Sequence, residues 1–298
     1  MAQNNNNNII MDIPKLRLNY FPNTIANKLH VLKNNMIVEE FEEDLDQVST
    51  LCIDGNEKDI LSSNILGDLY KFRHLNVLSI PSFLIGQFKK EDIPNTVSIL
   101  KINIPENFKQ KHIDIICPDV ILPNVKSIIF SFSSSSIRID NLLGISPNNF
   151  PNLEYLNCRL DKKGKILDFI KPFKSLLFLE VEFVGNNPLF ESISAQLKTL
   201  VIVGADHEFQ INDISKIKNL ETILLNGIKS EINCSVFTFL SNLKELSVWN
   251  SKKITNIESL LNCKYLKNIS VINCGNPFGK LRHRFNDNHY NYLDIKYS

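Results

Sequence analysis

The sequence predicts a right-handed β/α solenoid with one parallel sheet on its concave face. An apolar triplet of the form Leu-x-x-Leu-x-Leu recurs along the chain at intervals of 27, 22, 28, 28, 23, 21, 23, 23, 23 and 24 residues. A period in the twenties is typical of stacked repeats. A second apolar series precedes each new triplet, so each unit has one strand and one return segment, and that order gives parallel strands with a right-handed crossover. The triplets begin at Val48, Leu75, Val97, Val125, Leu153, Leu176, Leu197, Leu220, Leu243, Leu266 and Tyr290.

Length and composition agree with this class and exclude several functions. A chain of 298 residues need not contain two domains if it grows by stacking units. The net charge of +1 creates no overall field toward nucleic acid or an anionic membrane, so we expect neither as a partner. No stretch has the apolar length of a signal peptide or a membrane span, so we expect a cytoplasmic protein.

The N-terminal residues depart from the repeat. Residues 1–10 are rich in asparagine and predict a disordered tail, because they cannot bury enough apolar area. Residues 11–47 predict an N-terminal cap, since terminal units of a solenoid are atypical. Ile13, Leu16 and Leu18 fit the strand triplet once, and helical spacing follows at Ile25, Leu29 and Leu32. The acidic run at 39–46 is either a solvated surface of the cap or a docking site for a basic partner.

The solenoid itself is predicted over residues 48–298, as about eleven units. Ile211, Ile214 and Ile217 are spaced by three, which suits a short helix or 3₁₀ turns, and we expect 3₁₀ or extended returns in the shorter units. Another return is expected to point Val236, Phe239 and Leu240 inward before the strand at Leu243. The longer units have room for an α-helix, with helical spacing at Ile60, Leu61, Ile65, Leu66, Leu69 and Phe72.

Six cysteines are expected to be reduced structural thiols. None belongs to a C-x-x-C pair, so neither a zinc site nor a disulfide framework is indicated. Several fall on apolar positions of the repeat, where a free cysteine packs as a small hydrophobe. They are Cys52, Cys117, Cys158, Cys234, Cys263 and Cys274.

The strand triplet with its apolar return resembles the leucine-rich-repeat family. The best stretch includes LKELSVWNSKKITNIESLLNCKYLKNISVINCGNPF, which begins at Leu243. It is similar to the short-repeat class found in internalins and protein-phosphatase regulators, and the resemblance covers residues 48–298. It implies a non-catalytic module for protein–protein interaction. A regulatory or adaptor subunit is the alternative: a phosphatase regulator, or a ubiquitin-ligase receptor that presents a substrate to a separate enzyme.

The resemblance also implies a polar ladder, which this chain keeps only in part. The family places Asn or Cys eight residues after the first leucine, where the side chain bonds neighbouring turns. Asn56 and Cys274 fit this position, and Ser133, Asp161 and Ser251 could replace them partly. The apolar residues Phe83, Val184 and Ile228 cannot. We therefore expect turns that differ between units.

The candidate partner site is the concave face of the sheet. Strand side chains alternate in direction, so the residues between the triplet positions form three outward columns that should be solvated. Large apolar residues among them suggest a contact patch, although outward β-branched residues also stabilise a sheet by themselves. The predicted partner-binding residues are Tyr155, Phe178, Glu180, Val201, Leu224, Trp249 and Ile272.

No catalytic, cofactor or metal site is predicted. The sequence has no G-x-S-x-G elbow, phosphate-binding glycine loop or H-E-x-x-H motif. No histidine has metal-ligand spacing to another histidine or to a cysteine. The basic cluster Lys280, Arg282, His283 and Arg284 is interpreted as a solvated loop before a last strand at 290–297. We therefore expect no enzyme and no cofactor.

Overall fold

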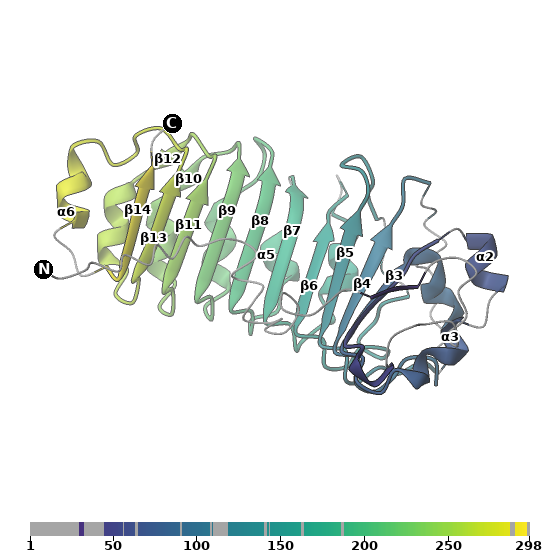
Figure 1. Cartoon of the computed structure of the whole chain (residues 1–298). Helices are drawn as coiled ribbons and strands as arrows, with labels where there is room; N and C mark the ends of the chain where they lie inside the picture. Colours follow the sequence, from purple (N-terminus) through teal and green to yellow (C-terminus); the bar gives the residue numbers. More distant parts are fainter. Residues whose placement is uncertain are drawn as a thin grey trace, which may run out of the picture.

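Twelve parallel strands form one sheet in the order β1-β2-β3-β4-β5-β6-β7-β8-β9-β11-β13-β14 (Figure 1). The computed structural model describes residues 30–32, 45–55, 57–62, 65–89, 91–107, 109, 119–139, 142, 144–161, 164–185, 188–286 and 290–296. Each main strand lies beside the next one in the chain, so the predicted β/α solenoid is confirmed. The pair β10 and β12, Ile232–Asn233 and Ile254–Thr255, forms a second small parallel sheet.

The main strands are short, because each repeat unit contributes one strand to the sheet. Their bounds are His30–Leu32 (β1), Thr50–Ile53 (β2), Val77–Pro81 (β3), Ile99–Ile104 (β4), Ser127–Phe132 (β5), Tyr155–Arg159 (β6), Phe178–Val184 (β7), Thr199–Ala205 (β8), Thr222–Ile228 (β9), Glu245–Trp249 (β11), Asn268–Ile272 (β13) and Tyr292–Lys296 (β14). The last strand is therefore shorter than the predicted 290–297, since Tyr290 lies before it.

Return segments lie behind the sheet in Figure 1 and are mostly single turns of helix. The α-helices are Glu57–Ser62 (α2), Ile65–Asp68 (α3), Leu167–Ile170 (α4), Leu189–Ser192 (α5) and Arg282–Asn286 (α6). The 3₁₀ helices are Leu45–Gln47 (η2), Leu69–Lys71 (η3), Ser82–Gln87 (η4), Ile211–Lys216 (η6), Cys234–Phe239 (η7), Ile257–Asn262 (η8) and Gly279–Leu281 (η9). No helix in these described parts of the chain has the length and apolar character to cross a membrane.

The predicted 3₁₀ and α-helical returns are confirmed, with one error of phase. Ile211, Ile214 and Ile217 are all buried in and after η6. In η7, however, Phe237 is fully buried while Phe239 is 62% exposed, so the prediction that Phe239 points inward is wrong. A 3₁₀ helix repeats every three residues. The inward positions are therefore Cys234, Phe237 and Leu240.

One continuous core lies between the sheet and the returns. Leu200, Leu246 and Ile269, the middle triplet residues of three strands, are fully buried there. The core extends from Val48 to Phe285 among the described residues. Stacked units share it, which is why no single repeat needs a core of its own.

At the positions where the resemblance predicts a ladder, Ser251 and Cys274 contact the neighbouring unit and Asp161 bonds within its own unit. Ser251 Oγ accepts from the Ile228 N–H at 3.0 Å and donates to the Trp249 carbonyl at 2.8 Å. Cys274 Sγ lies 3.2 Å from the Val248 and Ile272 carbonyls, and Asp161 Oδ2 accepts from the Ile166 N–H at 3.3 Å. Phe83, Val184 and Ile228 are buried apolar residues instead, and Asn56 lies outside the described residues.

The N-terminal edge differs from the predicted cap. His30–Leu32 forms strand β1 and pairs in parallel with Leu51–Ile53, so the helical spacing that includes Leu32 misled the prediction. The tail at 1–10, most of the cap and the acidic run at 39–44 lie outside the described residues.

We predict that the three buried thiols react only after unfolding and that the half-buried Cys263 reacts slowly in the native protein. Burial raises the pKa of Cys158, Cys234 and Cys274, and it raises the pKa of Cys263 to about 11. Since the thiolate is the reactive form, a Cys52→Ser/Cys117→Ser variant at pH 8 should leave a disulfide reagent almost unreacted. In denaturant without reductant it should titrate all four thiols. Rapid labelling of the native protein, or fewer than four thiols after unfolding, would contradict the prediction.

Candidate functional site

Three rows of side chains cross the concave face, which is the sheet face opposite the return segments. The strand register places them as the sequence predicts. The first row is Ser127, Tyr155, Phe178, Thr199, Thr222, Glu245, Asn268 and Tyr292. The second row is Ile129, Asn157, Glu180, Val201, Leu224, Ser247, Ser270 and Asp294. The third row is Arg159, Glu182, Val203, Asn226, Trp249, Ile272 and Lys296.

The first two rows are not solvated as expected. Four apolar side chains of these rows, with Val77 and Ile99 in register with the first row on β3 and β4, form a cluster separate from the main core, and Ile129, Val203 and Trp249 pack against it. Tyr155 and Phe178 lie at its centre, with ring centroids 4.5 Å apart, and both are fully buried. We call this set the concave cluster: Val77, Ile99, Tyr155, Phe178, Val201 and Leu224.

Glu180 is a buried carboxylate in the middle of this face. Only 2% of its surface is exposed, and the Tyr155 hydroxyl donates to its Oε2 at 3.1 Å. Taking a carboxylate out of water costs several kcal/mol unless donors or a cation compensate it. The Tyr155 hydroxyl therefore satisfies part of the hydrogen-bonding capacity of the buried Glu180 carboxyl group.

The Asn157 side chain bonds the backbone of β5 at the point where the ladder between β5 and β6 ends. The ladder between β5 and β6 ends at Ile129 and Asn157. One step further, Asn157 Oδ1 accepts from the Phe130 N–H at 2.6 Å and its Nδ2 donates to the Phe130 carbonyl at 3.2 Å. The side chain thus bonds both backbone groups of Phe130, and Ser131 and Arg159, which follow on the two strands, are not part of the ladder.

The third row is half exposed and contains the accessible part of the predicted site. Arg159 Nε donates to Glu182 Oε2 at 2.5 Å, so this pair is joined by charge as well as register. Trp249, the only tryptophan, donates from its indole nitrogen to Ser270 Oγ at 3.1 Å and keeps part of its ring exposed, and Ile272 lies beside it on β13. Tyr155, Phe178, Glu180, Val201 and Leu224 are the predicted residues that lie buried beneath this level.

A stack of arginine and phenylalanine at the end of β7 was not anticipated. The Arg138 guanidinium lies 4.1 Å from the Phe183 ring centroid, and Arg159 lies 5.7 Å from it and 4.2 Å from the Phe132 ring. Such contacts contribute about 0.5–1 kcal/mol each where they are exposed. Burial, followed by the nearby charge of Arg159, lowers the pKa of Arg138.

Phe183 also has a strained backbone. Its φ is 64°, in the left-handed region. On each of the next strands, the residue directly after the third-row residue also has a positive φ, but it is a glycine or an asparagine, which tolerate the left-handed region. These glycine and asparagine residues recur every 23 residues, so the sequence itself could have predicted a turn of positive φ after each strand: Gly204, Gly227, Asn250 and Asn273. Phe183 is the described position of this series that is neither glycine nor asparagine, and its ring packs against Arg138.

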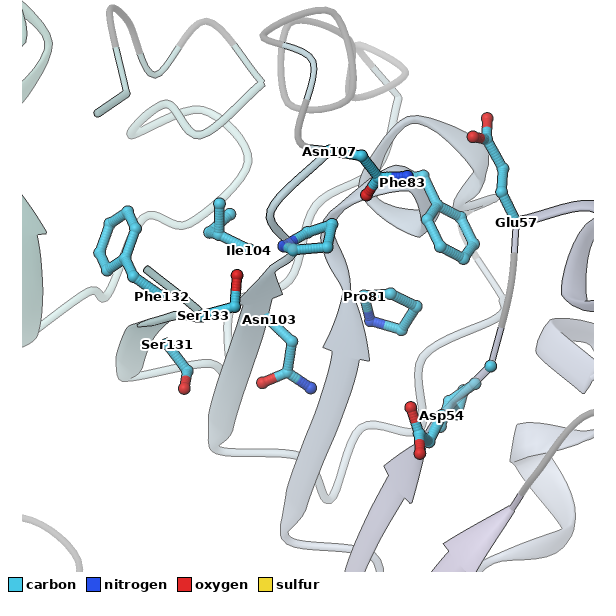
Figure 2. A pocket seen from close by; sticks show the side chains of 13 residues that line it. Asp54, Glu57, Pro81, Phe83, Asn103, Ile104, Asn107, Ser131, Phe132 and Ser133 are labelled. Atoms are coloured by element: carbon cyan, nitrogen blue, oxygen red, sulfur yellow. The ribbon is translucent and has the colours of Figure 1, made fainter. Parts of the chain in front are cut away.

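A hollow of about 360 Å³ opens at the ends of β2 to β5 (Figure 2). Asn103, Pro81 and Ser131 face it from the strands, and Asp54 and Glu57 bring two carboxylates. Its described lining contains no histidine, cysteine, lysine or arginine. The hollow can hold polar groups of a ligand.

The large apolar side chains that are exposed lie mainly elsewhere. Phe183, near the end of β7, is 41% exposed. The other exposed large apolar side chains of the described residues lie in helical returns and loops: Leu61, Tyr70, Ile121, Phe239 and Tyr265. In the basic cluster, Lys280, Arg282, His283 and Arg284 occupy η9 and α6 and are not buried. No group of three or more metal-ligating side chains occurs within the described ranges.

Comparison with known proteins adds a likeness of fold. No family model matches the chain, and no curated protein matches it. A similar solved structure is the crystal structure of an internalin (inlF) from Listeria monocytogenes, with 16% identity and a TM-score of 0.46. The match covers 77% of this chain and 61% of the internalin chain, less than two thirds of its length. The single parallel sheet with its return segments is that of a β/α solenoid.

Proposed function

We propose that the chain is a non-catalytic module for protein–protein interaction and that its partner binds on the concave face. The half-exposed Trp249 is the main support, because tryptophan, tyrosine and arginine dominate binding energy at interfaces. Its ring is held by the bond to Ser270 and lies in one row with Ile272. A rigid aromatic anchor loses little side-chain entropy when a partner covers it.

Charge adds selectivity to this surface. The Arg159–Glu182 pair lies in the same row as Trp249. Val203 on β8 and Asn226 on β9 lie between Glu182 and Trp249. A partner that covers the row must meet one cation and one carboxylate beside Val203, and then Asn226 before the apolar pair Trp249 and Ile272. Complementary charges at the rim of an interface mainly raise specificity and the association rate.

A cytoplasmic location belongs to the same proposal. Its support is the state of the cysteines, since all five that the structure describes are free thiols. Thiols persist in reducing compartments, whereas small secreted domains use theirs as disulfides.

The test begins with the full chain as bait, and the captured partner is then titrated against variants. Trp249→Ala should weaken binding about 30-fold, equivalent to about 2 kcal/mol. Phe239→Ala is the matched control, because it removes an exposed aromatic ring from a return segment and should leave the affinity unchanged. Full affinity in a Trp249→Ala/Ile272→Ala double variant, or a loss on Phe239→Ala, would reject the concave face as the binding site.

A further inference from the structure

Another hollow, of about 440 Å³, opens at the carboxyl ends of β6 to β9, along the upper edge of the sheet in Figure 1. Three buried apolar residues line it, Leu160, Val184 and Ala205. Gly204 and Gly227 also line it and have no side chain to fill the space. Ligand pockets commonly measure about 300–1,000 Å³, so the hollow is large enough to receive a side chain of a partner.

Arg138 presents unused hydrogen-bond donors to this hollow. Its Nη1 donates to the Ser135 carbonyl at 2.5 Å and to the Ile137 carbonyl at 2.8 Å. Within the described ranges, its Nε and Nη2 make no hydrogen bond and no carboxylate forms an ion pair with it. Two neighbouring N–H donors of a guanidinium match the two oxygens of a carboxylate, so the Nε–Nη2 edge is a ready site for one.

The same guanidinium is held in place before any ligand binds. It lies 4.1 Å from the centroid of the Phe183 ring, which is 41% exposed. The ring contact and the two carbonyl bonds fix the plane of the guanidinium, so pairing with a ligand costs little further side-chain entropy. Phe183 itself has a φ of 64°, and such strained positions are concentrated at ligand sites.

The charges around the hollow select the kind of ligand. Its described lining contains two cations, Arg138 and Lys229, and one carboxylate, Asp206. The adjacent Arg159 and Glu182 neutralise each other as an ion pair. The lining therefore has one net positive charge. A carboxylate neutralises that charge, whereas a phosphoryl group, with a charge of about −1.5 to −2 at pH 7, exceeds it.

We propose that this hollow binds an acidic side chain of the partner protein, whose carboxylate pairs with the Nε–Nη2 edge of Arg138 while the neighbouring apolar residue of the partner packs on Phe183. The inference rests on the proposed function, because it gives the protein partner a chemical character. Phe183 directly follows Glu182 of the third row, so one segment of the partner can contact both the row and the hollow.

Random dodecapeptides displayed on phage serve as the probe. The library is selected on the immobilised full-length chain, and peptides that also bind the Arg138→Gln variant are removed. We expect the remaining peptides to share an aspartate or a glutamate next to a large apolar residue. If no peptide remains, or if the remaining peptides share no acidic residue, the proposal is overturned.

Titration of a synthetic selected peptide, followed by fluorescence anisotropy, measures the contact. Arg138→Gln should weaken binding about 10-fold, and exchange of the acidic residue of the peptide for its amide should weaken binding to the wild type by a similar factor. The two changes together should weaken binding little more than either alone, because they remove the same ion pair. Arg284→Gln is the matched control, since it removes an exposed arginine from α6 and should leave the affinity unchanged.

Lys229→Gln keeps the test decisive if Arg138→Gln lowers the stability of the fold. Lys229 is exposed, and its loss should weaken binding about threefold because the positive charge of the hollow falls. Equal affinities for the acidic peptide and its amide, or equal losses in Arg284→Gln and Arg138→Gln, would overturn the proposal. A phosphoserine peptide that bound more than about 10-fold tighter than the acidic peptide would also overturn it, because the hollow would then be a phosphate site.

Trp249→Ala separates this inference from the proposed function. If the selected peptides lose affinity for Arg138→Gln and keep it for Trp249→Ala, the hollow binds by itself, and it stands even if the concave face fails its own test. If the partner captured by the full chain loses affinity for Trp249→Ala and keeps it for Arg138→Gln, the concave face is the binding site and the inference about the hollow is overturned.

Discussion

Replacing Phe237 with alanine should lower the free energy of unfolding by about 3–5 kcal/mol. Its ring is fully buried between the sheet and the neighbouring returns, in the stack formed by η6, η7 and η8. Alanine leaves a cavity there, because stacked units on both sides hold the surrounding backbone in place. Equilibrium unfolding in urea, followed by circular dichroism, measures the loss.

Phe239→Ala is the matched comparison, two residues further along the same 3₁₀ helix. The Phe239 ring is 62% exposed, so its removal should change stability by no more than about 0.5 kcal/mol. Similar losses in both variants would contradict the three-residue phase of η7. If Phe239→Ala lowered the free energy of unfolding more than Phe237→Ala, Phe239 would be the residue that points into the core, as the sequence predicts.

This pair of residues shows where the sequence is ambiguous. The segment CSVFTFL places apolar residues at spacings of both three and four. A 3₁₀ turn and an α-turn differ by only 0.6 residue, so a single turn cannot be assigned from its apolar residues alone. The strand register had no such ambiguity. Alternation fixes which side chains share a face, and the 23-residue interval fixes which of them are neighbours, as Trp249 and Ile272 illustrate.

Periodicity also cannot report what lies over a face. It assigns Tyr155 and Phe178 to the concave side correctly, but alternation along a strand does not report how far a side chain on that side is buried. The three-residue strand β1 was missed because it is too short to show alternation. The partner site remains a prediction, with its accessible members now limited to Trp249 and Ile272.

Asn157→Leu should destabilise the sheet by about 2–4 kcal/mol. The leucine cannot replace the bonds to the Phe130 N–H and carbonyl, and each buried backbone group left unpaired costs about 1–3 kcal/mol. Because the strand ladder already ends beside this position, no neighbouring backbone group can take over. Hydrogen exchange should show the loss first between β5 and β6.

Asn219→Ala serves as the control, since it removes one exposed bond to the Ala195 carbonyl and should cost less than about 1 kcal/mol. Asn157→Asp adds a test of sign. The introduced carboxylate can accept from the Phe130 N–H but repels the Phe130 carbonyl, which raises its pKa in the folded state above the usual value of about 3.9. A raised carboxyl pKa means that stability falls as pH increases, so this variant should approach the wild type in acid and lose stability toward pH 7. A pH-independent difference, or equal losses for Asn157→Leu and Asn219→Ala, would show that Asn157 does not hold the two strands together.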